Sequence, residues 1–140
     1  MGRFPDCFPV DFATKILPAN AGYTRHHVYR VVKSGRIDRQ AFESSYEENL
    51  RQARFRRPRP LRKDDPSTYS TSCCVDYEQA AFLKKVTFRD PPEAIIAEGI
   101  TEPICGPTLK NQASGHVDWW IYKDAKPECY FKEVPQNGSK

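Results

Sequence analysis

The chain has 140 residues and a mass of 16.1 kDa, with 39% hydrophobic and 12% aromatic residues, as expected for one globular domain over residues 1–140. No stretch approaches the roughly 18 consecutive apolar residues of a membrane span, and the N-terminus lacks a secretion signal, so we expect a cytoplasmic protein without membrane contact. The net charge of +4 is local, because residues 51–63 hold seven basic residues and no acidic one, which leaves the rest of the chain at −3.

The first elements predicted along the chain are a short helix and a strand. Residues 12–17 carry one apolar stripe that ends before Pro18, which indicates a helix of about two turns. The stretch "HVYRVV", residues 27–32, is rich in β-branched and aromatic residues and predicts a strand. Arg30 lies in its middle, on the same face as two valines, so its charge needs either a ligand or an acidic partner.

A helix and an exposed loop are expected next. Asp38 is suited to cap a helix that reaches about Leu50. Its inward stripe would comprise Ala41, Phe42, Ser45, Tyr46, Asn49 and Leu50, with Glu43, Glu47 and Glu48 on the outer side. Two prolines then interrupt the basic residues and exclude a regular helix, so residues 53 to 66 are predicted to form an exposed basic loop.

The hydroxyl-rich stretch "TYSTSCCV", residues 68–75, predicts a strand that leads into a helix. Strand alternation places Ser70 and Ser72 on one face together with Cys74. Asp76 and Gln79 have the spacing of a capping box ahead of "YEQAAFLKKV". We therefore expect a strand followed at once by a helix.

The last third of the chain predicts strands separated by one long loop. Residues 94–100 form a continuous apolar run typical of a buried strand, whereas residues 101–115 show no periodicity and indicate a long loop. "HVDWWIYKDAKPECYFKEV", residues 116–134, predicts a hairpin. The expected fold class is α+β, a small single domain with a mixed, mostly antiparallel sheet and two or three short helices.

Three features occur in a set order: an arginine in an early strand, a Ser-Thr-Ser run before a helix, and an acid at the start of a late strand. These are Arg30, Ser70–Ser72 and Asp118. The order resembles the ADP-ribosyltransferase superfamily. Its arginine–serine–glutamate branch has an arginine on the first core strand, then a Ser-Thr-Ser strand with a following helix, then a flexible loop before a Glu-x-Glu or Gln-x-Glu.

This resemblance implies an ADP-ribosyltransferase-like fold that takes NAD as its substrate and needs no metal. Arg30 would take the place of the strand arginine and hold the phosphate or ribose, for which its bidentate fork is suited. Ser70, Thr71 and Ser72 would shape the pocket. Residues 101–115 look like the substrate-contacting loop.

The acid is where the sequence departs from the family pattern. Asp118, with His116 beside it, stands where the family has its second glutamate, and aspartate is one methylene shorter. Glu98 and Glu102 are alternative acids. A carboxylate there would stabilise the oxocarbenium-like ribose as nicotinamide leaves. NAD binding, NAD hydrolysis, transfer to a protein or nucleic acid and an inactive site all remain open. Small domains of this kind resemble bacterial or phage toxins and defence factors.

The sequence also allows two other classes of site. The zinc-binding residue types are Cys73, Cys74, Cys105, His116 and Cys129, but no C-x-x-C or close histidine pair supports a metal site, so we expect none. The alternative function is a non-enzymatic module that holds a protein or nucleic acid through the basic loop and an exposed tryptophan. Its cations would be Arg54, Arg56, Arg57 and Arg59, with Trp119 or Trp120 as the tryptophan.

Overall fold

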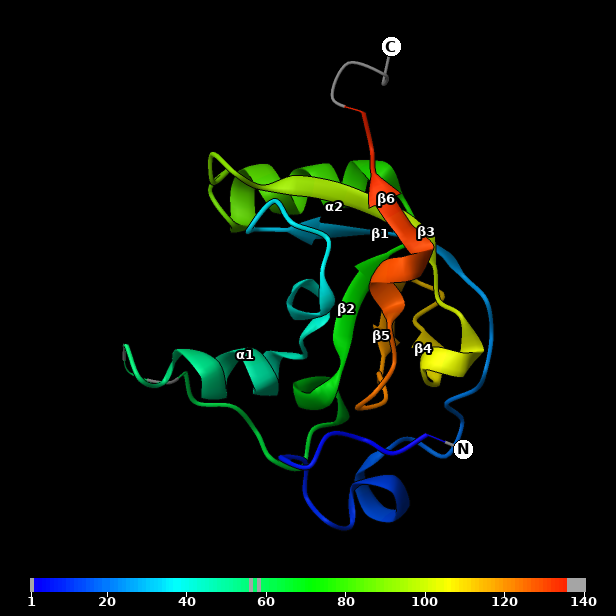
Figure 1. Ribbon diagram of the computed structural model, residues 1–140. Helices are drawn as coiled ribbons and strands as arrows, with labels where there is room; N and C mark the ends of the chain where they lie inside the picture. Colours follow the sequence, from blue (N-terminus) through cyan, green and yellow to red (C-terminus); the bar gives the residue numbers. More distant parts are fainter. Residues whose placement is uncertain (1, 56, 58, 136–140) are drawn as a thin grey trace.

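β1 (His27–Val32) lies near the middle of a six-stranded sheet in the computed structural model, which describes residues 2–55, 57 and 59–135. The strand order is β4-β5-β2-β1-β3-β6, and each neighbouring pair is antiparallel (Figure 1). The protein is therefore a small α+β domain with few short helices, as the sequence predicts. The expected mixed sheet is antiparallel throughout its described strands.

The two neighbours of β1 pair with it very differently. β3 (Ile95–Ile100) pairs with β1 along its whole length, from His27 opposite Ile100 to Val32 opposite Ile95. β2 (Thr71–Cys74) meets β1 at a single register position, Tyr29 opposite Cys74. Beyond that position β2 turns away steeply from β1 (Figure 1). The sheet is therefore split on one side of Tyr29.

The predicted hairpin near the C-terminus is wrong. β5 (His116–Trp119) lies between β2 and β4 (Thr108–Lys110), whereas β6 (Phe131–Glu133) pairs with β3 at the opposite edge. Phe131 decides this placement, because its ring packs against Phe42 with centroids 4.8 Å apart. Gly99 opposite Phe131 leaves room for that side chain, since a Cβ on Gly99 would lie 2.4 Å from the Phe131 ring.

Part of the stretch predicted as a long loop forms structure. Residues 101–115 contain η5 (Pro103–Cys105) and β4, which pairs with β5. Gly106 between them has φ of +141°, and a Cβ there would lie 1.9 Å from the Trp120 carbonyl oxygen, so only glycine fits. A three-residue edge strand is too short for its alternation to show in the sequence.

The single helix predicted from Asp38 is two helices. η2 (Arg39–Phe42) is capped by Asp38 as expected, since its Oδ1 accepts from the Ala41 N–H at 3.0 Å. α1 (Ser45–Gln52) starts afresh at Ser44, whose hydroxyl accepts from the Glu47 N–H at 3.1 Å while the Glu47 carboxylate accepts from the Ser44 N–H at 2.9 Å. This capping box breaks the predicted stripe.

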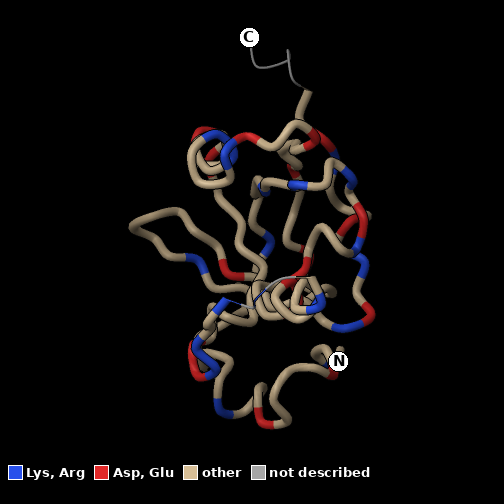
Figure 2. The backbone as a smooth tube through the Cα atoms, turned by 90° about the vertical axis from the view of Figure 1, so that its left-hand side faces the viewer, with Lys and Arg blue, Asp and Glu red and all other residues tan. Residues whose placement is uncertain are grey.

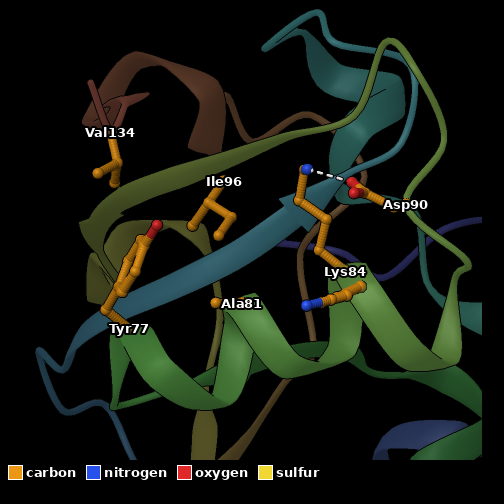
Figure 3. A pocket seen from close by; sticks show the side chains of 7 residues that line it. Tyr77, Ala81, Lys84, Asp90, Ile96 and Val134 are labelled. Atoms are coloured by element: carbon orange, nitrogen blue, oxygen red, sulfur yellow. Dashed lines mark hydrogen bonds and ion pairs between the residues drawn. The ribbon is translucent and has the colours of Figure 1, made fainter. Parts of the chain in front are cut away.

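α2 (Tyr77–Phe82) continues as η4 (Leu83–Thr87) across one face of β1 (Figure 1). The predicted capping box is wrong, because the Asp76 side chain caps nothing and the Gln79 amide donates to the Ser114 carbonyl instead. Lys84 reaches Asp90 across a small cavity of about 200 Å³ between α2 and β3 (Figure 3). None of the predicted site residues lines that cavity.

Two apolar cores hold the domain together. The first fills the face of the sheet opposite α2 and includes Trp119 and Phe42. The second lies under the N-terminal segment, where the π-helical turn η1 (Phe12–Ile16) replaces the predicted two-turn helix and Phe12 packs near Trp120. Both tryptophans are 0% exposed. The prediction of an exposed tryptophan in a binding module is therefore wrong, because packed elements cover both sides of the chain at the end of β5.

The basic residues that follow α1 form an exposed irregular segment, as predicted, on the side of the molecule that Figure 2 turns toward the viewer. Arg56 lies outside the described residues. The chain then forms η3 (Pro66–Tyr69) before β2, and η6 (Pro127–Tyr130) precedes β6. Across the described residues, no helix combines the length and apolar character needed to cross a membrane.

Candidate functional site

A cavity of about 550 Å³ opens on the α2 side of the sheet, where β1 and β2 diverge. Its volume lies within the range of about 300–1,000 Å³ that is typical of small-molecule sites. Strands β1, β2 and β5 provide the floor, and the walls come from α1, from the basic segment and from η4 with Phe88. The lining residues used below are Tyr29, Arg30, Lys33, Glu43, Glu48, Arg59, Ser70, Ser72, Cys74, Phe88 and His116.

Strand register explains why the hydroxyl cluster reaches this cavity. Ser72 lies opposite Asp118 on β5, and Cys74 lies opposite His116. Side chains two residues apart on a strand share a face, so Ser70 joins them on the α2 side. The predicted face of Ser70, Ser72 and Cys74 does line the cavity.

Asp118 is held directly behind this floor by two hydrogen bonds. Its Oδ1 accepts from the Ser70 hydroxyl at 2.6 Å and from His116 Nε2 at 3.0 Å. Burial raises the pKa of Asp118, but the hydrogen bonds from His116 and Ser70 outweigh it and leave the pKa below the ordinary value of 3.8. The carboxylate is therefore ionised, and it reaches the cavity through His116 and Ser70.

The same contact acts on His116. Its hydrogen bond to Asp118 raises the pKa of His116 above the ordinary 6.5, against the opposing effect of burial. The His116 side chain is 42% exposed, compared with 18% for Asp118. A histidine with a raised pKa that faces a cavity can exchange a proton with a ligand near neutral pH. The bonding order places Asp118 between Ser70 and His116, which is not the order of a serine-nucleophile triad.

This pair predicts a defined pH dependence of stability. The contribution of His116 is full below pH 6.5 and is lost as the pH rises through its raised folded pKa. The contribution of Asp118 is full above pH 3.8 and is lost as the pH falls through its lowered folded pKa. The free-energy difference between wild type and Asp118→Asn should therefore be largest between these values. Urea unfolding over a pH series measures it.

An NMR titration gives an independent check on this prediction. Among the three histidines, His116 should titrate above 6.5 and His26 below it, because burial and Lys110 lower the pKa of His26. In Asp118→Asn the His116 midpoint should move down while that of His26 stays. An unchanged His116 midpoint in the variant would contradict the contact.

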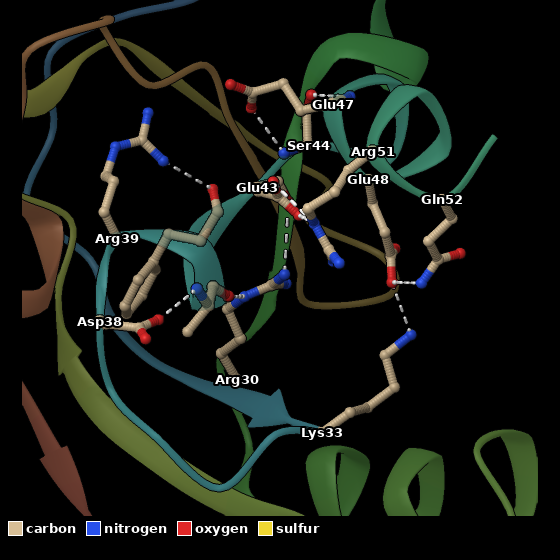
Figure 4. A network of polar contacts seen from close by, with 12 residues as sticks. Arg30, Lys33, Asp38, Arg39, Glu43, Ser44, Glu47, Glu48, Arg51 and Gln52 are labelled. Carbon is tan, nitrogen blue, oxygen red and sulfur yellow. Dashed lines mark hydrogen bonds and ion pairs between the residues drawn. The ribbon is translucent and has the colours of Figure 1, made fainter. Parts of the chain in front are cut away.

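Arg30 bridges β1 and β2 where the sheet is split. Its Nε donates to the Ala41 carbonyl at 2.8 Å and its Nη1 to the Ser72 carbonyl at 2.6 Å. Its Nη2 donates to the Glu43 carbonyl at 3.5 Å (Figure 4). Within the described residues no carboxylate pairs with its guanidinium, so the acidic partner considered from the sequence is absent there. Burial lowers the pKa of Arg30. Arg30 thus joins β1, β2 and η2 at the cavity edge.

Two carboxylates that the sequence placed on the outer side of a helix line the cavity instead. Glu48 pairs with Lys33 at 3.0 Å and Glu43 with Arg51 at 2.9 Å (Figure 4). Burial raises the pKa of Glu43, against its hydrogen bond from Arg51. The "SSYE" spacing at Ser44 was the signal for this geometry, because a helix that starts there turns Glu48 toward the sheet.

Two predicted site residues lie elsewhere. Thr71 faces the opposite side of β2, is buried, and donates to the Phe42 carbonyl at 2.6 Å. Glu102 precedes η5 and pairs with Arg25 at 2.9 Å, and Glu98 pairs with His27 at 2.7 Å. None of these side chains lines the cavity. The structure therefore brings together Arg30, Ser70, Ser72, His116 and Asp118, but not Thr71 or Glu102.

The cysteines show no metal geometry. Among the described residues, no group of three or more histidine, cysteine or acidic side chains is placed to hold an ion. Burial raises the pKa of Cys73 to about 12 and that of Cys105 to about 11, so both stay thiols at neutral pH. Cys74 lines the cavity and its pKa is also raised by burial.

No protein-family model matches this chain, and no curated protein or solved structure is significantly similar to it. What the site can do therefore follows from its own chemistry. It combines cations, a histidine–aspartate pair, two further carboxylates and aromatic surface around one cavity. Such a combination suits a ligand that carries both phosphate and a ring system.

Proposed function

We propose that the cavity binds NAD, and that the protein is an ADP-ribosyltransferase-like enzyme that cleaves NAD or transfers its ADP-ribose. One observation carries this proposal: Arg30 of β1, Ser72 of β2, His116 of β5 and Ser70, which directly precedes β2, line one cavity, with Asp118 hydrogen-bonded directly behind it. The order of elements around them, an arginine strand, a Ser-Thr-Ser strand with a helix after it and an acid on a late strand, is the order of the resemblance.

The cavity has the groups that a dinucleotide requires. Arg59 and Lys33, which is paired with Glu48, are exposed cations among the lining residues and would bind a pyrophosphate, and the guanidinium of Arg30 lies at the cavity edge. Tyr29 and Phe88 offer aromatic surface on which nicotinamide or adenine can pack. Ser72 is small and exposed, so the ribose can approach the strand closely. These features support NAD over a ligand without phosphate.

Cleavage needs negative charge near the ribose as nicotinamide leaves. In this proposal Asp118 holds His116 in one orientation and keeps it protonated to higher pH, and His116 contacts the ligand. Glu48 and Glu43 are the carboxylates that line the cavity themselves, so they are the groups that face the developing charge. The acid role that the resemblance assigns to Asp118 is thus shared with residues of α1 and its leading loop.

The test is titration of the protein with NAD by calorimetry, together with chromatographic measurement of nicotinamide release. We expect His116→Ala to slow release by about 100-fold, the lower range for a proton-transferring residue. His27→Ala is the matched control, because His27 also pairs with a carboxylate, Glu98, but lies outside the cavity. It should leave release unchanged.

Two outcomes would refute this function. One is wild-type protein that neither binds NAD nor releases nicotinamide at millimolar NAD. The other is equal release by His116→Ala and His27→Ala. A comparison of Glu48→Gln with Asp118→Asn then shows which carboxylate faces the ribose. A larger loss of nicotinamide release in Glu48→Gln supports direct contact between Glu48 of α1 and the ligand.

A further inference from the structure

The surface beside the cavity carries exposed cations that form no ion pair among the described residues. Among the described residues of the basic segment (residues 51–63), four exposed cations form no ion pair with another described residue: Arg54, Arg57, Arg59 and Lys63. The two other described cations are paired, Arg51 with Glu43 and Arg62 with Asp64. Because the rest of the chain has a net negative charge, this segment is where the sequence concentrates the positive charge that attracts a polyanion.

Phe55 lies among these cations with its ring in solvent. It is 79% exposed, and the Arg54 guanidinium lies 5.7 Å from its ring centroid. An exposed aromatic ring beside a guanidinium is an arrangement on which unpaired bases stack in proteins that bind single strands. An acidic peptide would use the cations but has no need of the ring.

The second half of the segment, from Arg59 to Lys63, is held to the domain by hydrogen bonds. The Asn49 side chain accepts from the Arg59 N–H at 2.8 Å and donates to the Arg59 carbonyl at 2.9 Å. Further along, the Tyr69 hydroxyl donates to the Lys63 carbonyl at 2.9 Å. These contacts fix the backbone on both sides of residues 60–62, and Arg59 also lines the cavity.

We propose that the basic segment binds single-stranded nucleic acid. Phe55 stacks on a base, Arg54 and Arg57 contact phosphates, and Arg59 leads the strand past the mouth of the cavity. A duplex should bind this surface more weakly, because its bases are stacked on one another and cannot stack on Phe55. The inference stands on the segment itself and does not depend on NAD binding.

Fluorescence anisotropy with a labelled single-stranded oligonucleotide of about 16 nucleotides tests it, in DNA and RNA forms. Phe55→Ala should weaken binding by about 5-fold or more, the loss expected for one stacked base. Phe82→Ala is the matched control, since Phe82 is also exposed, at 61%, but lies on α2. Arg54→Ala/Arg57→Ala should reduce the slope of log Kd against log salt by about 1.4.

Each contrary result is decisive. Equal affinity for a duplex of the same length, equal affinity for polyglutamate, or equal effects of Phe55→Ala and Phe82→Ala would overturn the proposal, as would no binding at low salt. Binding of either DNA or RNA supports it, and their ratio identifies the preferred strand. NAD titration of Phe55→Ala should match wild type, so that failure here and failure of the proposed enzyme can be told apart.

Discussion

Arg30→Ala is expected to lower the free energy of unfolding by about 3 kcal/mol, because it leaves backbone carbonyls of three segments without their donor at a partly buried position. Those carbonyls belong to Ala41, Glu43 and Ser72. The substitution should also disturb the shape of the cavity, since Ser72 lies on its floor and Glu43 on its wall. The proposed NAD binding should weaken together with stability.

The variant Arg30→Lys distinguishes the hydrogen-bonding geometry of the guanidinium from its positive charge. A lysine keeps the positive charge but cannot donate in three fixed directions, so it should recover only part of the lost stability. Arg36→Ala is the matched control for loss of an arginine, since its side chain is 75% exposed and its only ion pair among described residues is with Asp38 at 3.6 Å. Urea unfolding measures all three variants. Full stability in Arg30→Lys would show that charge alone suffices.

Phe42→Ala is expected to cost about 3–5 kcal/mol of unfolding free energy, the range for truncating a buried phenylalanine. Phe42 is 0% exposed and contacts the rings of Trp119 and Phe131 at centroid distances of 6.3 and 4.8 Å. Its carbonyl also accepts the hydroxyl of Thr71. The truncation therefore leaves a cavity where β5, β6 and η2 meet.

Phe82→Ala is the comparison for this truncation as well. Phe82 loses the same atoms but is 61% exposed, so its replacement should change the unfolding free energy by no more than about 0.5 kcal/mol. Thermal and urea unfolding of both variants gives the difference directly. Similar losses in the two variants would mean that Phe42 does not anchor the core.

Local chemistry predicted most of the elements correctly. The β-branched run at 27–32, the hydroxyl strand with its helix and the apolar run near Ile96 all form as expected, because each pattern is contained within one short stretch. Alternation also placed Ser70 and Ser72 on one face. The capping of η2 by Asp38 follows from neighbouring residues in the same way.

Two of the errors share one cause, which is competition from contacts distant in sequence. The hairpin failed because Phe131 packs beside Phe42 and places β6 next to β3. The predicted cap by Gln79 failed because its amide bonds to Ser114. The sequence pattern places Glu48 on the outer side of a helix, which is wrong because the capping box at Ser44 starts a new helix. Of these three features, only the helix start at Ser44 is indicated by the local sequence.

In the candidate site, the residue types and their order can be read from local patterns in the sequence: Arg30, the Ser70–Ser72 run, and His116 with Asp118. Which of these residues meet depends on contacts between strands that are distant in sequence. The single register position between β1 and β2 splits the sheet, and pairing of β2 with β5 then sets Ser70 beside Asp118 and leaves Thr71 on the far face. Strand pairing and burial are properties of the whole chain, so no local pattern could specify them.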